Sequence, residues 1–326
     1  LLGAVLLTVI TSPVTPAFAQ ANAQFETITF SQDSIVTATP VQVSLTNLVG
    51  NGTIRYTTNG SVPDANSTPY TRPLPVNEST VIRAQLFAND GTPVGNVYTK
   101  SYIISDHEQT IPVVSIVADW MDLNTLHTFP TERGIEWERP INVEYFEPGG
   151  EVAFNAPAGV RIHGNFSRIY SPKKSYRIYF RNEYGLGKLD YPMFEDSPVT
   201  KFDKLLLRAG FQDTFVHRGI PERSDRHDTA KFIGDQVTRN LHRDMGQPIA
   251  HGKWALLFLN GEFWGLYNLT ERIDLQFLQS YSDENSDWHI ISKESGWDEF
   301  GIWYSREAVK EGNYGAWLDN QEWVGS

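Results

Sequence analysis

The stretch ALLFLNGEFWGLYNL, residues 255–269, carries the strongest local structural signal in the sequence. Two apolar runs flank the pair Asn260-Gly261, which favours a two-residue β-hairpin turn because it tolerates positive φ at both central positions. An antiparallel hairpin is therefore expected here. A helix should follow at once, beginning near Thr270 with Glu271 in its first turn. The expected apolar face of that helix consists of Ile273, Phe277, Leu278 and Tyr281.

The sequence before the hairpin predicts further strands and one more helix. The runs that indicate strands are IPVVSIVAD at 111–119, INVEYFEP at 141–148, GVRIHG at 159–164, KSYRIYF at 174–180 and KLLLRAG at 204–210. In the helix, Ile233, Val237 and Leu241 repeat at helical spacing, with Asp228 as N-cap and Gly246 as the stop. An α+β domain is therefore expected over residues 111–326.

Residues 25–104 form a separate unit, joined to the second domain by a polar linker at 105–110. Short alternating runs rich in Thr and Val, separated by Asn, Gly and Pro, predict an antiparallel β-sandwich. The stretch IRYTTNGSVPDANSTPYTRPLPV at 54–76 resembles the chitobiase C-terminal-like module. Four aromatic residues are expected mainly in its core, and an exposed carbohydrate-binding face is the weaker alternative. They are Tyr56, Tyr70, Phe87 and Tyr102.

Composition narrows the function classes. The net charge of -12 makes nucleic acid an improbable general partner, and the absence of cysteine excludes disulfides and thiol chemistry. The apolar start LLGAVLLTVI, with Ala17-Phe18-Ala19 before Gln20, predicts a signal peptide over residues 1–19, incomplete at its N-terminus. After cleavage, no later stretch is long and apolar enough to span a bilayer. The sequence therefore predicts a protein that is secreted or at the cell surface.

Three stretches together resemble the CotH family of secreted atypical kinases: GVRIHGNFSRIYSPKKSYRIYF at 159–180, KLLLRAG at 204–210 and LLFLNGEFWGLYNLTERIDLQFL at 256–278. The resemblance spans roughly residues 111–281. It implies a kinase-like fold and phosphoryl transfer from ATP, with Mg or Mn, to Ser or Thr of secreted or surface proteins. The fold class expected is thus an N-terminal antiparallel β-sandwich followed by an incomplete kinase-like α+β domain.

The resemblance directs attention to a turn and a lysine as phosphate-binding groups. Gly164, Asn165 and Ser167 can form a turn whose N–H groups face an anion. Strand alternation places Lys174 on the side of Tyr176 and Ile178, which suggests that Lys174 reaches a partly buried pocket while Lys173 stays solvated. Without the resemblance, an ordinary hairpin with two surface lysines would be the preferred interpretation.

Two carboxylates are candidates to position that lysine, namely Asp228 and Glu271. The resemblance implies an Arg-Asp pair at this place, and here His227 separates Asp228 from Arg226, whereas Glu271 is equally well explained as a first-turn acid. Arg161, Arg168 and Arg208 could contact phosphate or form surface ion pairs, and His163, His217 and His227 show no metal-ligand spacing.

The catalytic and metal-binding acids of the family are expected downstream of Ser326, so this chain should be inactive alone; no metal ligand is assigned within it. The main alternative is a non-catalytic surface or scaffold protein whose β-sandwich associates with polysaccharide or cell wall. A glycoside hydrolase is the third possibility, drawn from the module and the abundant tryptophan.

Overall fold

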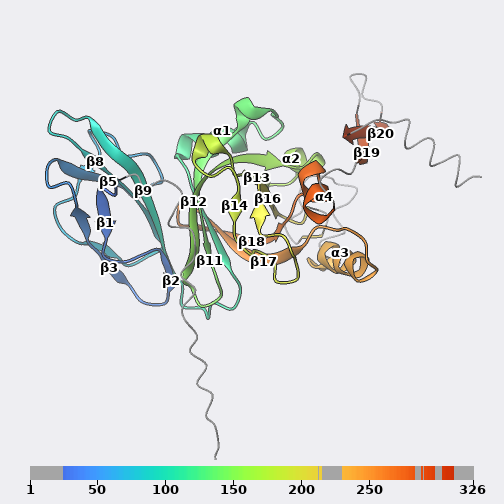
Figure 1. Cartoon of the computed structure of the whole chain (residues 1–326), viewed down its shortest axis with the longest axis horizontal. Coiled ribbons are helices and arrows are strands. Elements are labelled where there is room, and N and C mark those ends of the chain that lie inside the picture. The colour runs from blue at the N-terminus through green and yellow to red at the C-terminus, as the bar shows by residue number, and fades with distance from the viewer. Residues whose placement is uncertain are drawn as a thin grey trace, which may run out of the picture.

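The computed structural model describes residues 25–211, 213–214, 230–282, 288, 290–297 and 303–311. Its two main bodies are an N-terminal β-sandwich and a β-barrel beside it (Figure 1). The predicted signal peptide lies outside the described residues. None of the helices in the described ranges has the length and apolar character that crossing a bilayer requires.

The sandwich is built from nine strands, most of them short, as its Thr- and Val-rich alternation predicts. They are β1 (Ile28–Phe30), β2 (Ile35–Thr37), β3 (Val41–Val43), β4 (Leu45–Asn47), β5 (Thr53–Thr57), β6 (Thr68–Pro69), β7 (Leu74–Val76), β8 (Thr80–Phe87) and β9 (Pro93–Ile104). A five-stranded sheet in the order β2-β9-β8-β5-β6 is accompanied by the pairs β1-β4 and β3-β7. Pairing is antiparallel except between β2 and β9, so the expected sandwich is present with one parallel exception.

The aromatic side chains of the sandwich serve packing. Tyr102 and Phe87 are buried, and Tyr56 and Tyr70 pack against the core around Val43. Two of these rings are buried and two are partly buried by packing, and association with polysaccharide stays a prediction.

The second body is a closed seven-stranded barrel in the order β10-β11-β12-β13-β16-β18-β17. Its strands are β10 (Val113–Val117), β11 (Arg139–Phe146), β12 (Val152–His163), β13 (Ser175–Tyr179), β16 (Lys204–Arg208), β17 (Gly252–Leu259) and β18 (Glu262–Thr270). Neighbours are antiparallel, except that β10 pairs in parallel with β17, Val113 opposite Leu256. This pairing closes the sheet, and its inward side chains, including Tyr176, Leu207 and Tyr267, fill the interior.

The predicted hairpin is confirmed. Asn260 and Gly261 have φ of 49° and 85°, as a type I′ turn requires, and they join β17 to β18. The turn also meets the sandwich. The Asn260 side chain accepts from Ala118 N at 2.9 Å and donates to Ala118 O at 3.0 Å, beside the second Asn-Gly turn at Gly60.

Short helices and strands surround the barrel. The helices are α1 (Trp120–Thr128), α2 (Phe166–Tyr170), α3 (Gly234–Asp244) and α4 (Leu275–Tyr281), with 3-10 turns η2 (Ile135–Trp137) and η3 (Asn182–Tyr184). The remaining strands form two hairpins, β14 (Leu189–Asp190) with β15 (Lys201–Phe202) and β19 (Ile290–Trp297) with β20 (Trp303–Glu311). The described residues are thus mostly β-sheet with few helices, and the kinase-like α+β fold stays an expectation.

Helix α3 has its apolar spacing on the outer side. Ile233, Val237 and Leu241 are about half exposed, whereas Gln236 and Arg239 are buried against the barrel. Arg239 donates to Gln236 at 2.8 Å and also to Asn268 on β18, so polar bonds attach this helix to the barrel. The predicted N-cap is wrong: α3 begins at Gly234 with Ile233 as its N-cap residue, and Asp228 lies outside the described residues.

The predicted start of the last helix is wrong. Thr270 still belongs to β18, where it pairs with both β16 and β17, and Glu271 follows the strand. Helix α4 begins at Leu275, because Asp274 is the N-cap and its side chain accepts from Phe277 N. Pairing on both edges of β18 keeps this segment extended for longer than its helical periodicity suggests.

Candidate functional site

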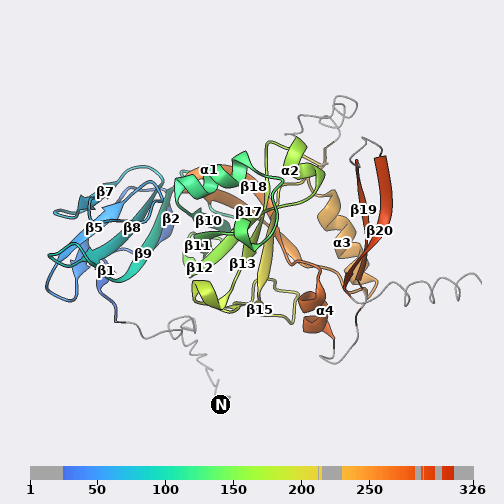
Figure 2. The same cartoon turned by 90° about the horizontal axis from the view of Figure 1, so that it is seen from above.

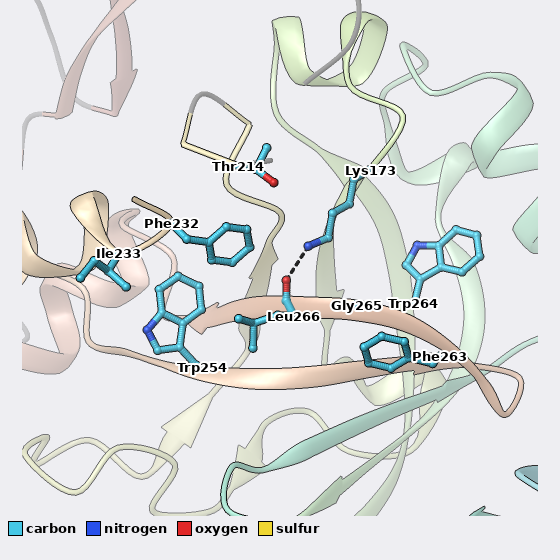
Figure 3. A pocket seen from close by; sticks show the side chains of 9 residues that line it. All are labelled: Lys173, Thr214, Phe232, Ile233, Trp254, Phe263, Trp264, Gly265 and Leu266. Carbon is cyan, nitrogen blue, oxygen red and sulfur yellow. Dashed lines mark hydrogen bonds between the residues drawn. The ribbon is translucent and has the colours of Figure 1, made fainter. Parts of the chain in front are cut away.

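A pocket of about 490 Å³ opens on the outer side of the β17-β18 hairpin. Its lining is almost entirely apolar or aromatic and consists of Lys173, Thr214, Phe232, Ile233, Trp254, Phe263, Trp264, Gly265 and Leu266. In Figure 3, Phe232 and Trp254 lie on one side, Trp264 and Phe263 on the other, and Lys173 reaches between them. Such a pocket suits a ligand with a flat apolar part and a negative charge.

Lys173 is the charged residue of this lining. Its Nζ donates to the carbonyl oxygen of Leu266 and lies 4.3 Å from the ring centroid of Tyr267 and 5.2 Å from that of Phe232. Burial lowers the pKa of Lys173 to about 8. Gly265 borders the lysine stem; its φ of +122° favours glycine, whereas a Cβ there would make only an ordinary van der Waals contact with Lys173 Cε at 3.4 Å. The ammonium group is held by a carbonyl and two rings.

The structure reverses the expected orientation of the two lysines. Strand β13 begins only at Ser175, so strand alternation does not extend to the lysines before it. Lys173 enters the pocket, and Lys174 instead donates to the carbonyls of Arg168 at 2.7 Å and Ser171 at 2.6 Å. The assignment of Lys174 to nucleotide binding stays a prediction, and Lys173, which was expected to stay solvated, is the lysine of the pocket.

The glycine-containing turn lies next to Lys174 and outside the lining of the pocket. Gly164 has φ +117°, and a Cβ there would lie 2.0 Å from Ser167 Oγ, so this close turn needs glycine. Asn165 is the N-cap residue of α2 and accepts from Arg133 at 3.2 Å. The structure thus brings Gly164, Asn165, Ser167 and Lys174 together around α2.

Glu271 lies elsewhere. Its carboxylate accepts from the backbone N–H of His251 at 2.8 Å and from the Tyr281 hydroxyl at 2.8 Å, and it lies 2.9 Å from His251 Nδ1. Both Glu271 and His251 are buried. The structure therefore does not bring Glu271 to Lys174; its carboxylate ties the start of β17 to α4. Asp228, the other predicted partner, is outside the described residues.

Residues 168–177 carry four basic side chains that meet no carboxylate within the described ranges. We name this stretch the cationic segment. Arg168 donates to the carbonyls of Gly164, Pro130 and Glu132, and Arg177 donates to Tyr179 Oη and His163 Nδ1; Lys173 and Lys174 bond to carbonyls as described above. Burial lowers the pKa of all four groups. Unpaired, partly buried cations are costly in a protein, and a bound anion offsets that cost.

The pKa of His163 is lowered by its burial and by the positive charges near it. It lies on β12 opposite Ser175, and its Nδ1 is 2.8 Å from an Arg177 nitrogen. Burial, followed by the charge of Arg177 and then of Arg272 and Arg208, lowers the pKa of His163 to about 2. The imidazole is therefore neutral and accepts from Arg177. A positive region thus exists on an outer sheet face of a chain whose net charge is -12.

The other arginines named from sequence have ordinary partners. Arg161 lies 3.2 Å from the buried carboxylate of Glu138, and Arg208 lies 3.2 Å from Asp235. These two are ion pairs, whereas the bonds that Arg168 makes within the described part of the chain go to carbonyls. Within the ranges that the structure describes, no group of three His, Asp or Glu side chains could hold a metal ion.

Two known protein families match the chain, one over the sandwich and the other over the region that contains most of the barrel. Residues 160–320 match the family model described as CotH kinase protein, and residues 34–114 match that of the chitobiase/beta-hexosaminidase C-terminal domain. No curated protein matched the chain. Both family resemblances seen in the sequence are thereby confirmed.

Proposed function

Because the chain carries a CotH kinase domain behind a chitobiase-type C-terminal domain, we propose that it functions as a secreted kinase-like protein. In this proposal, the family activity is transfer of phosphate from ATP to Ser or Thr of secreted, surface or coat proteins, and the described residues of this chain contribute ATP binding and not the catalytic acids. Residues 1–19 serve as the signal for export.

The observation that carries the proposal is the unpaired charge of the cationic segment. A triphosphate brings several negative charges and many acceptor oxygens, and charge-assisted hydrogen bonds from lysine and arginine are the strong ones. The guanidinium of Arg177 and the ammonium groups of Lys173 and Lys174 have no carboxylate among the described residues. They can therefore turn to a ligand without breaking an ion pair.

The pocket beside the cationic segment supplies the complementary apolar surface. Phe232 and Trp254 lie 5.3 Å apart, centroid to centroid, and both line the pocket with Lys173. Aromatic faces stack on nucleobases with about 1–3 kcal/mol per base. An aromatic base with a charged tail therefore fits the residues present.

Mg or Mn is expected with ATP from the family. The described residues do not include a ligand group for such an ion, so no step is derived through a metal. The side chains of this chain would bind and orient the triphosphate of ATP. Lys173 would neutralise a phosphate oxygen at the mouth of the pocket, and Arg177 also lies on the outer face of the barrel.

Binding of ATP by the full chain, followed by calorimetry with and without Mg or Mn, tests this proposal. Lys173→Met should weaken binding about ten- to a hundredfold, because a hydrogen bond to a charged group contributes about 1.5–3 kcal/mol. In the wild type, binding should also weaken as the pH rises through about 8, where Lys173 loses its proton. The variant should lack this pH dependence.

Two variants act as controls. Lys188→Met removes an exposed lysine and should bind like the wild type. Lys174→Met asks whether the lysine expected from sequence contributes, and an effect larger than that of Lys173→Met would reverse the assignment made from the structure.

Unfolding of Lys173→Met should require no less free energy than unfolding of the wild type, because a desolvated, unpaired ammonium group is lost. If neither ATP nor tripolyphosphate binds the wild type, the scaffold alternative is favoured.

A further inference from the structure

The sandwich and the barrel share a buried seam. Val36 and Ile103 of the sandwich pack with Val113, Phe146 and Phe258 of the barrel in one apolar cluster. The two bodies lie against each other in both views (Figures 1 and 2). Polar bonds continue the seam: Ser101 and Ser115 hydroxyls are 2.8 Å apart, and Asn155 donates to Thr99 O at 2.8 Å.

Glu144 lies in the middle of this seam with a fully buried side chain. It sits on β11, opposite Ser115 of β10 and Asn155 of β12. Its Oε1 accepts from Ser34 Oγ of the sandwich and from Asn155 Nδ2 at 2.7 Å. Its Oε2 is buried and has no hydrogen-bond partner among the described residues. One carboxyl group thus joins the two bodies, with only half of its acceptor capacity used.

The charges that face Glu144 do not neutralise it. Among the described residues, Lys100 and Asp33 of the sandwich are the charged groups that act on Glu144, and Lys100 Nζ is bound to Asp33 at 2.5 Å. The remaining titratable neighbour is the buried Tyr102, whose hydroxyl donates to Gln32 O. Burial is the largest influence on Glu144, and it raises the pKa to about 7 although the nearby Ser101 and Ser34 hydroxyls act in the lowering direction. The carboxyl group is therefore neutral in acid and charged in mild alkali.

We propose that Glu144 is a pH-sensitive latch between the sandwich and the barrel. In its neutral form the side chain closes the seam through Ser34 and Asn155. Ionisation places a charge with no cation contact in the seam and loosens the docking of the sandwich. In the proposed function the protein is secreted and meets a range of external pH. Ionisation of Glu144 would then make the docking of the sandwich on the barrel depend on that pH. It stands apart from the cationic segment and does not depend on ATP binding.

The sign follows from the raised pKa. Relative to an unfolded glutamate of pKa 4.5, the folded group holds its proton more tightly, so its contribution to stability is complete below pH 4.5 and is lost as the pH rises through about 7. The melting temperature of the wild type should therefore fall between pH 5 and pH 8.5 by roughly 5 °C or more beyond the fall seen for Glu144→Gln. The amide cannot ionise.

The experiment measures melting temperature and backbone hydrogen exchange of the full chain at several pH values. Exchange in Ser101–Ile104 and Val113–Val117, corrected for intrinsic rates, should accelerate above pH 7 in the wild type and not in Glu144→Gln. Glu151→Gln, which removes an exposed carboxylate from the same region, should behave as the wild type. Equal pH dependence of wild type and Glu144→Gln would overturn the proposal. Should Glu144→Gln fail to fold, carbon NMR of the wild-type Glu144 carboxyl decides, since ionisation already complete at pH 5.5 would overturn it too.

Discussion

Replacing Glu138 with alanine is expected to lower the free energy of unfolding by about 3–5 kcal/mol. The Glu138 side chain is only 1% exposed and receives two arginines, with Arg181 Nε at 2.9 Å and Arg161 Nε at 3.2 Å. Both guanidinium groups also lie over the ring of Tyr179. Without the carboxylate, two partly buried cations lose their counter-ion next to the positive region around His163, and this repulsion adds to the desolvation cost.

Urea unfolding of the variant against the wild type measures the effect, and Glu136→Ala is the matched control. Glu136 lies two residues away and is exposed, so its loss should change the unfolding free energy by no more than about 0.5 kcal/mol. Of the two arginines, only Arg181 is aligned for a hydrogen bond with Glu138. A loss below about 1 kcal/mol for Glu138→Ala would mean that water, rather than the carboxylate, compensates these arginines.

Local signals in the sequence predicted the elements that depend on local chemistry. The Asn260-Gly261 turn and the strands beside it follow from turn geometry and apolar runs, and the sandwich follows from its alternation. Closure of the barrel could not be predicted in this way. It depends on β10 pairing with β17, where Val113 meets Leu256 across more than a hundred residues, and nothing in either strand alone specifies its partner.

In the candidate site, too, the local features could be predicted from the sequence and the features that depend on distant contacts could not. The Lys-Lys pair before β13 marked the correct segment, but the choice between the two lysines assumed that the strand had already begun. Helix α3 also departed from its predicted burial, because Arg239, Gln236 and Asn268 of β18 satisfy one another and leave the apolar side chains of α3 on the outer side. Unpaired charge in the cationic segment is a property of three-dimensional neighbours, so only the structure could reveal it.

The docking of the two Asn-Gly turns leads to the second large effect. Gly60 has φ +85°, and a Cβ there would lie 2.4 Å from Ala118 O and 2.4 Å from Asn260 Oδ1. Gly60→Ala should therefore lower the free energy of unfolding by about 2–4 kcal/mol, of which about 1–2 comes from the left-handed backbone and about 1–3 from the steric conflict. Arg83, which donates to Gly60 O at 2.8 Å, would lose its acceptor if the turn moved away.

Gly50→Ala separates the two causes. Gly50 lies in the same domain with φ +86°, and a Cβ there would meet nothing within 4 Å. This control should show the backbone cost alone, so the difference between the two variants in urea unfolding measures the contact of the sandwich turn with the barrel. Equal losses would show that the turns touch without supporting each other. A larger loss for Gly60→Ala, together with faster hydrogen exchange at Ala118, would establish that the sandwich is docked on the barrel through this turn and does not act as a freely tethered spacer.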